Sequence, residues 1–165
     1  MHKWYLAHCR PREEDRALHN LNNQNIDAFY PFVEVQKLRR GRKVLRTEAL
    51  FPGYLFIRVD LEVTSSTTIS STRGIRNLVR FGSHPCEVPA ELVYELMCHC
   101  DSDELREKLS DLPKCGDRVR ISEGPFAGLE AIYQEADGDT RAILLLTLLQ
   151  KETTASLANT DFIRL

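Results

Sequence analysis

Hydrophobic and polar positions follow a strand pattern and then a helix pattern at the start of the chain. Residues 3–9 (KWYLAHC) combine aromatic and aliphatic strand formers, and they stop before Pro11, which the middle of a sheet does not accommodate. Beyond Pro11, Ala17, Leu18 and Leu21 recur at helical spacing behind a first turn of acidic residues, which the helix dipole favours. The pattern predicts a strand, a turn and a helix whose apolar face packs inward.

Two further strand signals flank a basic segment. Residues 27–35 (DAFYPFVEV) and 50–60 (LFPGYLFIRVD) are aromatic and β-branched, and the second is broken once at Pro52-Gly53. Between them, residues 37–46 hold six basic side chains and no acidic one. This segment predicts a basic hairpin or loop, which is either a plain solvated turn or a contact with nucleic-acid phosphates.

Residues 62–97 predict a loop, a short strand and a helix. Residues 62–71 are rich in serine and threonine and predict a polar loop, whereas residues 78–82 (LVRFG) predict a short strand that ends in a turn. A proline precedes residues 90–97 (AELVYELM), as is typical of a helix start. The apolar positions of this predicted helix are Leu92, Val93, Leu96 and Met97.

A change of composition marks a domain boundary after this helix. Residues 101–112 (DSDELREKLSDL) are strongly charged and end at Pro113, which is typical of a linker or a frayed helix extension. The sequence therefore predicts a first domain over residues 1–100, a linker over 101–112 and a small second domain over 113–165.

The second domain supports two interpretations. Its turn signals, 123–125 (EGP) and 137–139 (DGD), have the spacing of a small β-barrel. Residues 142–151 (AILLLTLLQK), however, are leucine-rich and consist largely of strong helix formers. Such a conflict is expected either of a sequence with two folds or of one in which tertiary packing overrides local propensity.

Composition and charge narrow the class of protein. With 42% hydrophobic and 28% charged residues, and no apolar run of membrane-spanning length, the chain reads as a cytoplasmic globular protein. Residues 1–100 hold 14 Lys and Arg against 11 Asp and Glu, and the remainder holds 8 against 13. A mildly basic N-terminal part suits binding to a polyanion. The acidic C-terminal part can dock on the N-terminal part when no polyanion is bound, because opposite charges attract.

The chemistry-bearing residues predict neither a metal site nor an enzyme. The five cysteines lack a C-x-x-C pair, which argues against a disulfide framework and a zinc site; Cys98-His99-Cys100 has metal-binding atoms but no second pair of ligands. The chain contains no P-loop, dinucleotide-binding loop, H-E-x-x-H helix or nucleophile elbow. We therefore expect a non-catalytic protein without a cofactor.

Three stretches resemble the NusG family of transcription elongation factors. They are the Trp4-Tyr5 strand, residues 51–56 (FPGYLF), and residues 116–119 (GDRV) with 123–128 (EGPFAG), which resemble a KOW motif. They occur in family order in both domains. The resemblance implies an α+β protein whose N-terminal α/β sandwich, an antiparallel sheet flanked by helices, binds RNA polymerase and DNA and precedes a small C-terminal KOW-type domain.

Within the family, three features closely resemble an operon-specialised branch. These are residues 72–74 (TRG) followed by 79–82 (VRFG), the short basic hairpin of residues 39–43, and the leucine-rich tail. The resemblance implies a monomeric antitermination factor that an ops-type element in the non-template DNA strand recruits to polymerase. It also implies a C-terminal domain that forms an α-helical hairpin over the polymerase-binding surface, refolds on release into a β-barrel, recruits a small-subunit ribosomal protein and couples translation to transcription.

The resemblance also implies roles for individual residues. Its polymerase contacts are of two kinds, an aromatic patch for the clamp helices of the largest subunit and hydroxyls for the gate loop of the second-largest. Glu48 and Arg141 match an interdomain salt bridge, which at a surface contributes about 0.2 to 1 kcal/mol. The DNA residues are Arg10, Arg16, Asn20, Ser70, Thr72 and Arg73; the polymerase residues are Tyr54, Phe56 and Phe81 with Ser65, Ser66 and Thr67; the covering leucines are Leu144, Leu145 and Leu148.

Two alternatives remain at this point. An enzyme is one, although its catalytic residues are not visible in the sequence. The other is a general NusG-like factor or an RNA-binding KOW module, which shares the fold but lacks the specific recruitment and the closed state. The leucine-rich tail is the feature that separates this second alternative from the specialised branch.

Overall fold

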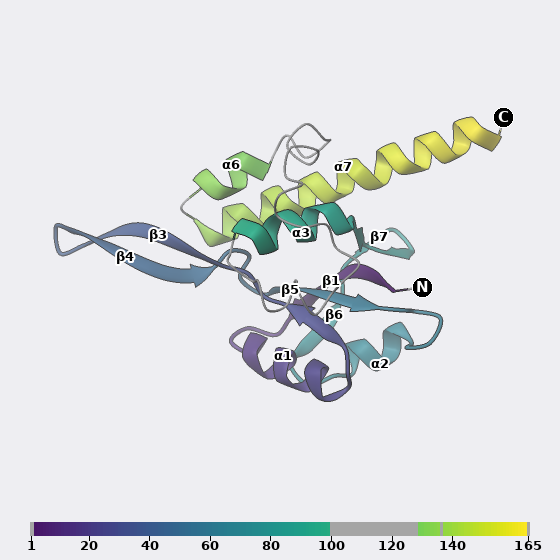
Figure 1. Cartoon of the computed structure of the whole chain (residues 1–165), viewed down its shortest axis with the longest axis horizontal. Helices are drawn as coiled ribbons and strands as arrows, with labels where there is room; N and C mark the ends of the chain where they lie inside the picture. Colours follow the sequence, from purple (N-terminus) through teal and green to yellow (C-terminus); the bar gives the residue numbers. More distant parts are fainter. Residues whose placement is uncertain (1, 100–128, 136, 165) are drawn as a thin grey trace.

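The computed structural model describes residues 2–99, 129–135 and 137–164 of the chain. The predicted linker at 101–112 and both parts of the KOW-like motif lie outside these residues. The described part forms three layers, with an antiparallel sheet between helices α1 and α2 on one side and helices α3, α6 and α7 on the other (Figure 1).

The central sheet is built around the first strand. β1 (Lys3–Cys9) pairs antiparallel with β5 (Tyr54–Val59) on one side and with β6 (Ile75–Leu78) and β9 (Glu87–Val88) on the other. β2 (Asp27–Phe29) pairs with the outer edge of β5 and gives the order β2-β5-β1-β6. The predicted strand at 3–9 is confirmed, and the aromatic segment around 54–59 lies in the middle of the sheet as predicted.

The alternation of side chains along β1 and β5 creates two separate cores. Leu55 and Ile57 lie on one face with Ala17 and Leu21 of α1 (Glu14–Asn23), so the predicted inward face of this helix is confirmed. Phe56 lies on the other face, fully buried in a cluster to which α3 (Ala90–His99) contributes. All four predicted apolar positions of α3, Leu92, Val93, Leu96 and Met97, are buried.

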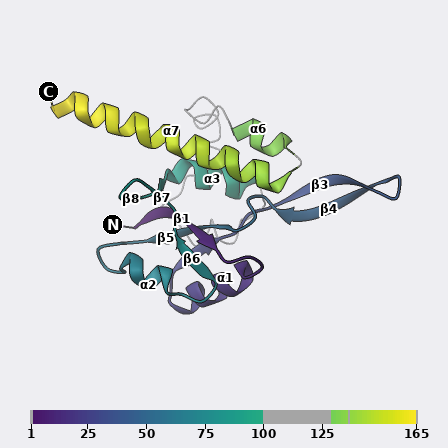
Figure 2. The same cartoon turned by 180° about the vertical axis from the view of Figure 1, so that it is seen from behind.

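Two hairpins extend from the sheet. β3 (Phe32–Arg39) and β4 (Arg42–Ala49) form a two-stranded ribbon that turns at Arg40-Gly41. Both views show this ribbon projecting away from the body (Figures 1 and 2). The basic hairpin predicted from the sequence is thus present. β7 (Arg80–Phe81) and β8 (His84–Pro85) form a second, much shorter hairpin around Gly82.

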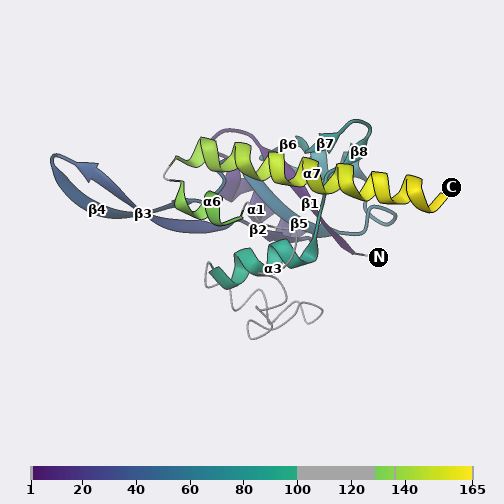
Figure 3. The same cartoon turned by 90° about the horizontal axis from the view of Figure 1, so that it is seen from above.

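The C-terminal segment is helical where the structure describes it. α6 (Leu129–Gln134) is followed by the long helix α7 (Gly138–Arg164), which crosses the same side of the sheet as α3 (Figure 3). Of the two interpretations of this segment, the described residues adopt the one that their leucine content favours. No helix within the described ranges is long and apolar enough to cross a membrane.

Two predicted boundaries are corrected. The strand predicted over residues 27–35 is interrupted at Tyr30-Pro31, because Pro31 has no N–H to donate and its carbonyl instead accepts from the Leu50 N–H at 2.9 Å. The polar loop predicted over 62–71 contains the short helix α2 (Ser66–Ser70), which begins after Ser65 because that hydroxyl accepts from the Thr68 N–H.

The described cysteines include two free thiols and one disulfide-bonded residue. Cys9 and Cys86 are buried free thiols, and burial, followed by the nearby charges of Glu14 and Glu87 respectively, raises the pKa of each to about 12. Cys98 is disulfide-bonded, whereas the prediction from the cysteine spacing concerned a framework of several disulfides. Among the described residues, no three His, Cys, Asp or Glu side chains gather as a metal site.

Candidate functional site

An aromatic and aliphatic face on the α3 side of the sheet is covered by the C-terminal helices. Phe56 packs edge-on against Phe51, with ring centroids 6.0 Å apart, and tilts toward Phe29 at 6.2 Å. Tyr54 lies at the edge of this face and stacks on His8 with centroids 4.9 Å apart; burial and the charge of Arg76 lower the pKa of that histidine. Of the predicted polymerase residues, Phe56 is fully buried in this face, whereas Tyr54 and Phe81 are half-buried and pack at the margin of the face.

The cover consists of leucines that recur at helical spacing. Leu145 and Leu149 of α7 and Ile132 of α6 are buried in the same cluster as Phe51 and Phe56. The predicted Leu144 and Leu148 are only partly buried and pack around its margin, together with Leu146. The structure therefore brings the three predicted leucines to the aromatic face, and it adds Leu149 and Ile132, which the sequence analysis did not include.

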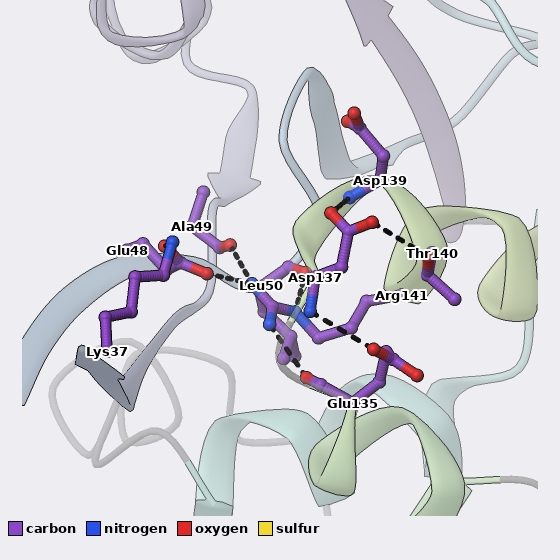
Figure 4. Close-up of polar contacts among 9 residues, drawn as sticks. All are labelled: Lys37, Glu48, Ala49, Leu50, Glu135, Asp137, Asp139, Thr140 and Arg141. Carbon is purple, nitrogen blue, oxygen red and sulfur yellow. Dashed lines mark hydrogen bonds and ion pairs between the residues drawn. The ribbon is translucent and has the colours of Figure 1, made fainter.

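Arg141 ties the start of α7 to the N-terminal domain (Figure 4). Its side chain is 0% exposed, and its Nη2 donates to Glu48 Oε1 at 2.7 Å and to the carbonyl of Ala49 at 3.1 Å. Its Nε donates to the Leu50 carbonyl at 2.8 Å, and its Nη1 donates to the Glu135 carbonyl at the end of α6 at 2.9 Å. One guanidinium thus connects the root of the β3–β4 hairpin, helix α6 and helix α7.

The expectation that Glu48 and Arg141 form a weakly contributing surface pair is wrong on the arginine side. The predicted partners are in contact, but Arg141 is buried. A buried charge is tolerated only when it is paired and its N–H groups are satisfied, which the three backbone carbonyls and the carboxylate accomplish here. Removing the arginine therefore has a larger effect than a surface pair predicts.

The first turn of α7 is fixed by short-range contacts. The Asp137 carboxylate accepts from the Asp139 N–H at 3.2 Å and from the Thr140 hydroxyl at 3.0 Å, as an N-terminal helix cap does. Gly138 lies so close to Pro52 that an added Cβ would be 2.7 Å from the proline Cγ. The absence of a side chain at Gly138 is therefore what allows α7 to approach the turn between β4 and β5.

Glu48 is shared between two cations. Its Oε2 also lies 2.7 Å from the Lys37 ammonium on β3. Partial burial raises the pKa of Glu48, but the hydrogen bonds and charges of Arg141 and Lys37 outweigh this, so its pKa is lower than the ordinary value of 4.5. The carboxylate is therefore ionised at neutral pH and joins both partners at once.

This lowered pKa predicts a pH dependence of the closed arrangement. A carboxylate whose pKa is depressed stabilises the folded form fully above its ordinary pKa, and this stabilisation is lost as the pH falls through the lowered value. We expect the amide NMR signals of residues 138–151 to lose their docked shifts in wild type as the pH falls from 6 toward about 3. In Glu48→Gln the docked population should be lower at pH 6 and should converge with wild type at the acid end. Parallel pH curves for the two proteins would contradict this role of Glu48.

The predicted DNA residues gather on the opposite side of the molecule. The Asn20 side chain of α1 donates to the Arg73 carbonyl at 3.1 Å, and the Arg10 N–H donates to the Gly74 carbonyl at 2.9 Å. The side chains of Arg10 and Arg73 are exposed, as a phosphate contact requires. The structure thus joins α1 and the 72–74 turn into one surface.

The other predicted DNA residues are either more buried or engaged by neighbouring side chains. Thr72 is 6% exposed, and its hydroxyl donates to the Thr68 carbonyl and accepts from the Gln24 amide, so it serves the turn itself. Arg16 is exposed but pairs with Glu13 at 3.0 Å. Ser70 ends α2 and is half-buried.

The predicted gate-loop residues mark the beginning of α2. Ser65 caps the helix and Thr67 is exposed, whereas the Ser66 hydroxyl accepts from Arg80 at 3.3 Å. Among the described residues, these three form no hydrogen bond with a residue of the covered aromatic face. Their role remains a prediction.

The close packing of the 72–74 turn against α1 explains why a glycine, Gly74, follows Thr72-Arg73. Its φ is +98°, and an added Cβ would be 2.7 Å from the Ala17 N and 2.8 Å from the Glu13 carbonyl, both of which belong to the backbone. Since neither group can move without shifting α1, only glycine permits this approach. The turn and helix α1 are therefore positioned by the same residue.

Gly74→Ala is predicted to destabilise the first domain strongly. The left-handed backbone and the overlap with α1 together cost about 2 to 5 kcal/mol, measured as the free energy of unfolding in urea. Gly82→Ala is the matched control, because Gly82 also has a positive φ of +68° but no atom within 4 Å of the added Cβ. It should lose only about 1 to 2 kcal/mol. Equal losses would contradict the close approach of the turn to α1.

Several groups of this site are not among the residues predicted from the sequence. The Ala49, Leu50 and Glu135 carbonyls could not be found, because backbone acceptors carry no residue signature. Leu149 could have been found, since Arg141, Leu145 and Leu149 follow one another at intervals of four residues, as the buried line of a helix does.

Comparisons with known proteins agree on one family. The family model described as "Transcription termination factor nusG" matches residues 2–97, which is more than half of the 165-residue chain. The chain is similar to "Transcription termination/antitermination protein NusG" of Thermus thermophilus, with 29% identity over 94% of each protein. It is also 26% identical to the protein of that name from Streptomyces coelicolor, over 94% of this chain and 61% of the longer relative.

Among solved structures, "Domain interaction in Thermotoga maritima NusG" is similar to part of the chain. The match covers 59% of this chain and 56% of that one, with 20% sequence identity and a TM-score of 0.41. The family assignment rests on the sequence matches.

Proposed function

The chain belongs to the NusG family of transcription termination and antitermination factors, which bind RNA polymerase and are not enzymes, and we propose that it is a specialised, autoinhibited member of that family. In this proposal it resembles RfaH, the operon-specific paralogue. It is recruited at an ops-type element in the non-template DNA strand and acts as an antitermination factor.

The observation that carries the proposal is the covering of the aromatic face. In a factor that is always active, the surface that binds polymerase is free. Here Phe56 is buried beneath Leu145 and Leu149, and Arg141 fastens the covering helix at its start. Aromatic side chains dominate the energetics of protein interfaces, so a cover over them suppresses binding until it is removed.

The energetics favour a cover over an open face. An uncovered cluster of aromatic and aliphatic side chains would be a contiguous apolar patch, which monomeric proteins rarely expose. Burying Leu145 and Leu149 contributes about 1.5 to 3 kcal/mol each relative to exposure, and the Arg141 contacts add to this. Polymerase must therefore be brought close by another interaction before it displaces the cover.

DNA recognition supplies that interaction in our proposal. The side chains of Arg10 and Arg73 are exposed on the α1 side of the sheet, away from the covered face. The backbone hydrogen bond from Arg10 to Gly74 keeps the two residues close together. A strand of DNA can therefore meet the closed protein without α7 moving. Phosphates bind the cations and an extruded base meets the polar groups, while Tyr54 and Phe81 with the rest of the covered patch bind the clamp helices after release.

The released C-terminal segment is proposed to change fold and to bind a small-subunit ribosomal protein. Turn signals of a β-barrel remain in a segment whose described residues are helical. Two packings of one sequence can differ by only a few kcal/mol, so contacts with the N-terminal domain are sufficient to select the helical one.

Circular dichroism tests this proposal. The intact chain should show the helix content of α6 and α7, whereas a peptide of residues 113–165 alone should show a strand spectrum. Adding residues 1–100 in trans should restore the helical spectrum. A helical isolated peptide would contradict the change of fold, and an intact chain that lacks the helix content of α6 and α7 would contradict the helical cover.

A general NusG-type factor without autoinhibition is the second candidate. The names of the relatives favour it, since both similar proteins described above are called NusG and match 94% of this chain. The two candidates differ in the free protein. The general factor binds polymerase without a delay and without DNA, whereas the specialised factor requires release of α7.

A further inference from the structure

His8 lies on the covered side of the sheet, near the end of β1. Successive side chains of a strand point to opposite faces, so His8 shares the face of Trp4 and Leu6, which belong to the covered aromatic cluster. Its strand partners are Tyr54 on β5 and Asn77 on β6. The imidazole is half-buried and stacks on the Tyr54 ring, with an angle of 17° between the two planes. His8 therefore lies at the margin of the surface that α7 covers.

A cavity of about 380 Å³ lies between this histidine and α7. Its walls are formed by His8 and Tyr54, by residues 77–80, and by Leu146 of α7. We call it the seam cavity, because it lies where the N-terminal domain and α7 meet. Release of α7 removes the Leu146 wall and exposes the imidazole to bulk water.

The N-terminal domain surrounds His8 with cations. Arg80 of β7 lines the seam cavity, and Arg76 of β6 acts on the imidazole through its charge. Arg10, two residues further along the chain, is a third cation near the same strand end. Tyr54 of β5 is the other titratable group of the cavity wall, and none of the described residues that line the cavity is acidic. An imidazolium at this position would therefore be repelled by its surroundings.

Helix α7 brings no charge that could compensate for this repulsion. Leu146 is its contribution to the cavity, and residues 142–150 contain no titratable side chain. Docking of α7 therefore removes water from the imidazole without supplying an anion, which disfavours the charged ring. In agreement with this geometry, burial and then the charge of Arg76 lower the pKa of His8 from its ordinary value of 6.5.

We propose that protonation of His8 promotes the release of α7, so that the cover over the aromatic face weakens as the solution becomes mildly acidic. The open form binds the proton more tightly, because water then surrounds the imidazolium and screens it from Arg76 and Arg80. The closed form is fully stabilised above the pKa that His8 has in the open form, and it loses this stabilisation as the pH falls through that value. The inference adds a regulation to the covered surface, and it rests on the proposed function of α7 as a cover.

Amide hydrogen exchange of the full-length chain between about pH 7.5 and pH 5.5 tests the proposal. Dividing the intrinsic exchange rate at each pH by the observed rate gives protection factors for the α7 amides of residues 142–149. In wild type these factors should fall by about threefold or more over this range, whereas the paired amides of β1 and β5 should keep theirs. Glu48 stays ionised throughout, because its pKa is lower than 4.5.

Two variants remove the titration in different ways. His8→Phe keeps an aromatic ring beside Tyr54, and His8→Gln keeps a polar side chain, but neither accepts a proton in this range. In both variants the protection of α7 should be independent of pH to within about twofold, whatever its level at pH 7.5. His84→Gln is the matched control, because His84 is exposed on β8 and does not line the seam cavity. This control should keep the wild-type fall.

Two results would overturn the proposal. An equal fall in wild type, His8→Phe and His8→Gln would show that another group binds the proton. Protection that stays constant or rises in wild type as the pH falls would show that docked α7 does not exclude the proton from His8. Either result, with α7 protected at pH 7.5, leaves the cover itself intact. Unprotected α7 amides at pH 7.5 would instead contradict the helical cover, and with it both proposals.

Discussion

Replacing Arg141 by methionine is expected to release α7 from the sheet in a large fraction of molecules. The substitution keeps an apolar stem but leaves the Ala49, Leu50 and Glu135 carbonyls and one oxygen of Glu48 without their donor. Removing one partner of a buried ionic network costs about 3 to 5 kcal/mol, and 3 kcal/mol corresponds to more than a hundredfold in the closed-to-open equilibrium. Amide hydrogen exchange of residues 141–149 measures this change directly.

Two comparisons identify the network as the cause. Arg141→Lys keeps the charge but cannot reproduce the planar fork of donors, so it should lose most of the protection. Lys37→Met removes the other cation from Glu48 at a position that is 45% exposed, and it should change the exchange by only about 0.2 to 1 kcal/mol. Equal effects of Arg141→Met and Lys37→Met would contradict the importance of the buried guanidinium.

Leu145→Ala is expected to have an effect of similar size for a different reason. Leu145 is 0% exposed within the aromatic cluster, and truncating a buried leucine to alanine costs about 2 to 5 kcal/mol. Because both faces of the sheet have their own core, the loss should appear in α7 and its contacts rather than in the α1 side. Hydrogen exchange should therefore increase along α7 while the β1 and β5 amides, which pair in the middle of the sheet, stay protected.

Ile143 provides the matched control for Leu145. It lies two residues away on the same helix but is 62% exposed, so Ile143→Ala removes a similar volume without uncovering the aromatic face. Its effect should stay within about 0.5 kcal/mol. If Ile143→Ala and Leu145→Ala opened α7 equally, the buried leucines could not be what holds the cover in place.

Much of the first domain could be predicted because local signals and tertiary structure agree there. The 3–9 strand, the inward face of α1 and the four buried residues of α3 follow from periodicity alone. Where the local signal and the observed structure disagree, tertiary contacts determine the secondary structure. The helix α2 forms within a hydroxyl-rich segment because Ser65 caps it and Ile69 is buried beneath it.

The site was less predictable because it depends on contacts distant in sequence. Arg141 reaches groups about 90 positions away, and nothing in its neighbours indicates that its charge is buried. Whether a leucine-rich segment forms a helix or a strand depends on the surface that it meets. Phe56 and the α3 residues supply that surface here, which local propensity alone does not contain.

Controlled removal of the cover shows whether α7 blocks the polymerase-binding surface. A protease site placed between residues 101 and 112 allows the same protein to be compared before and after cleavage, at concentrations low enough for the freed segment to dissociate. Binding to RNA polymerase without DNA should become at least about tenfold tighter after cleavage, because the Phe56 face no longer has to be uncovered. Equal affinity of the intact and the cleaved protein would show that α7 does not block the polymerase-binding surface.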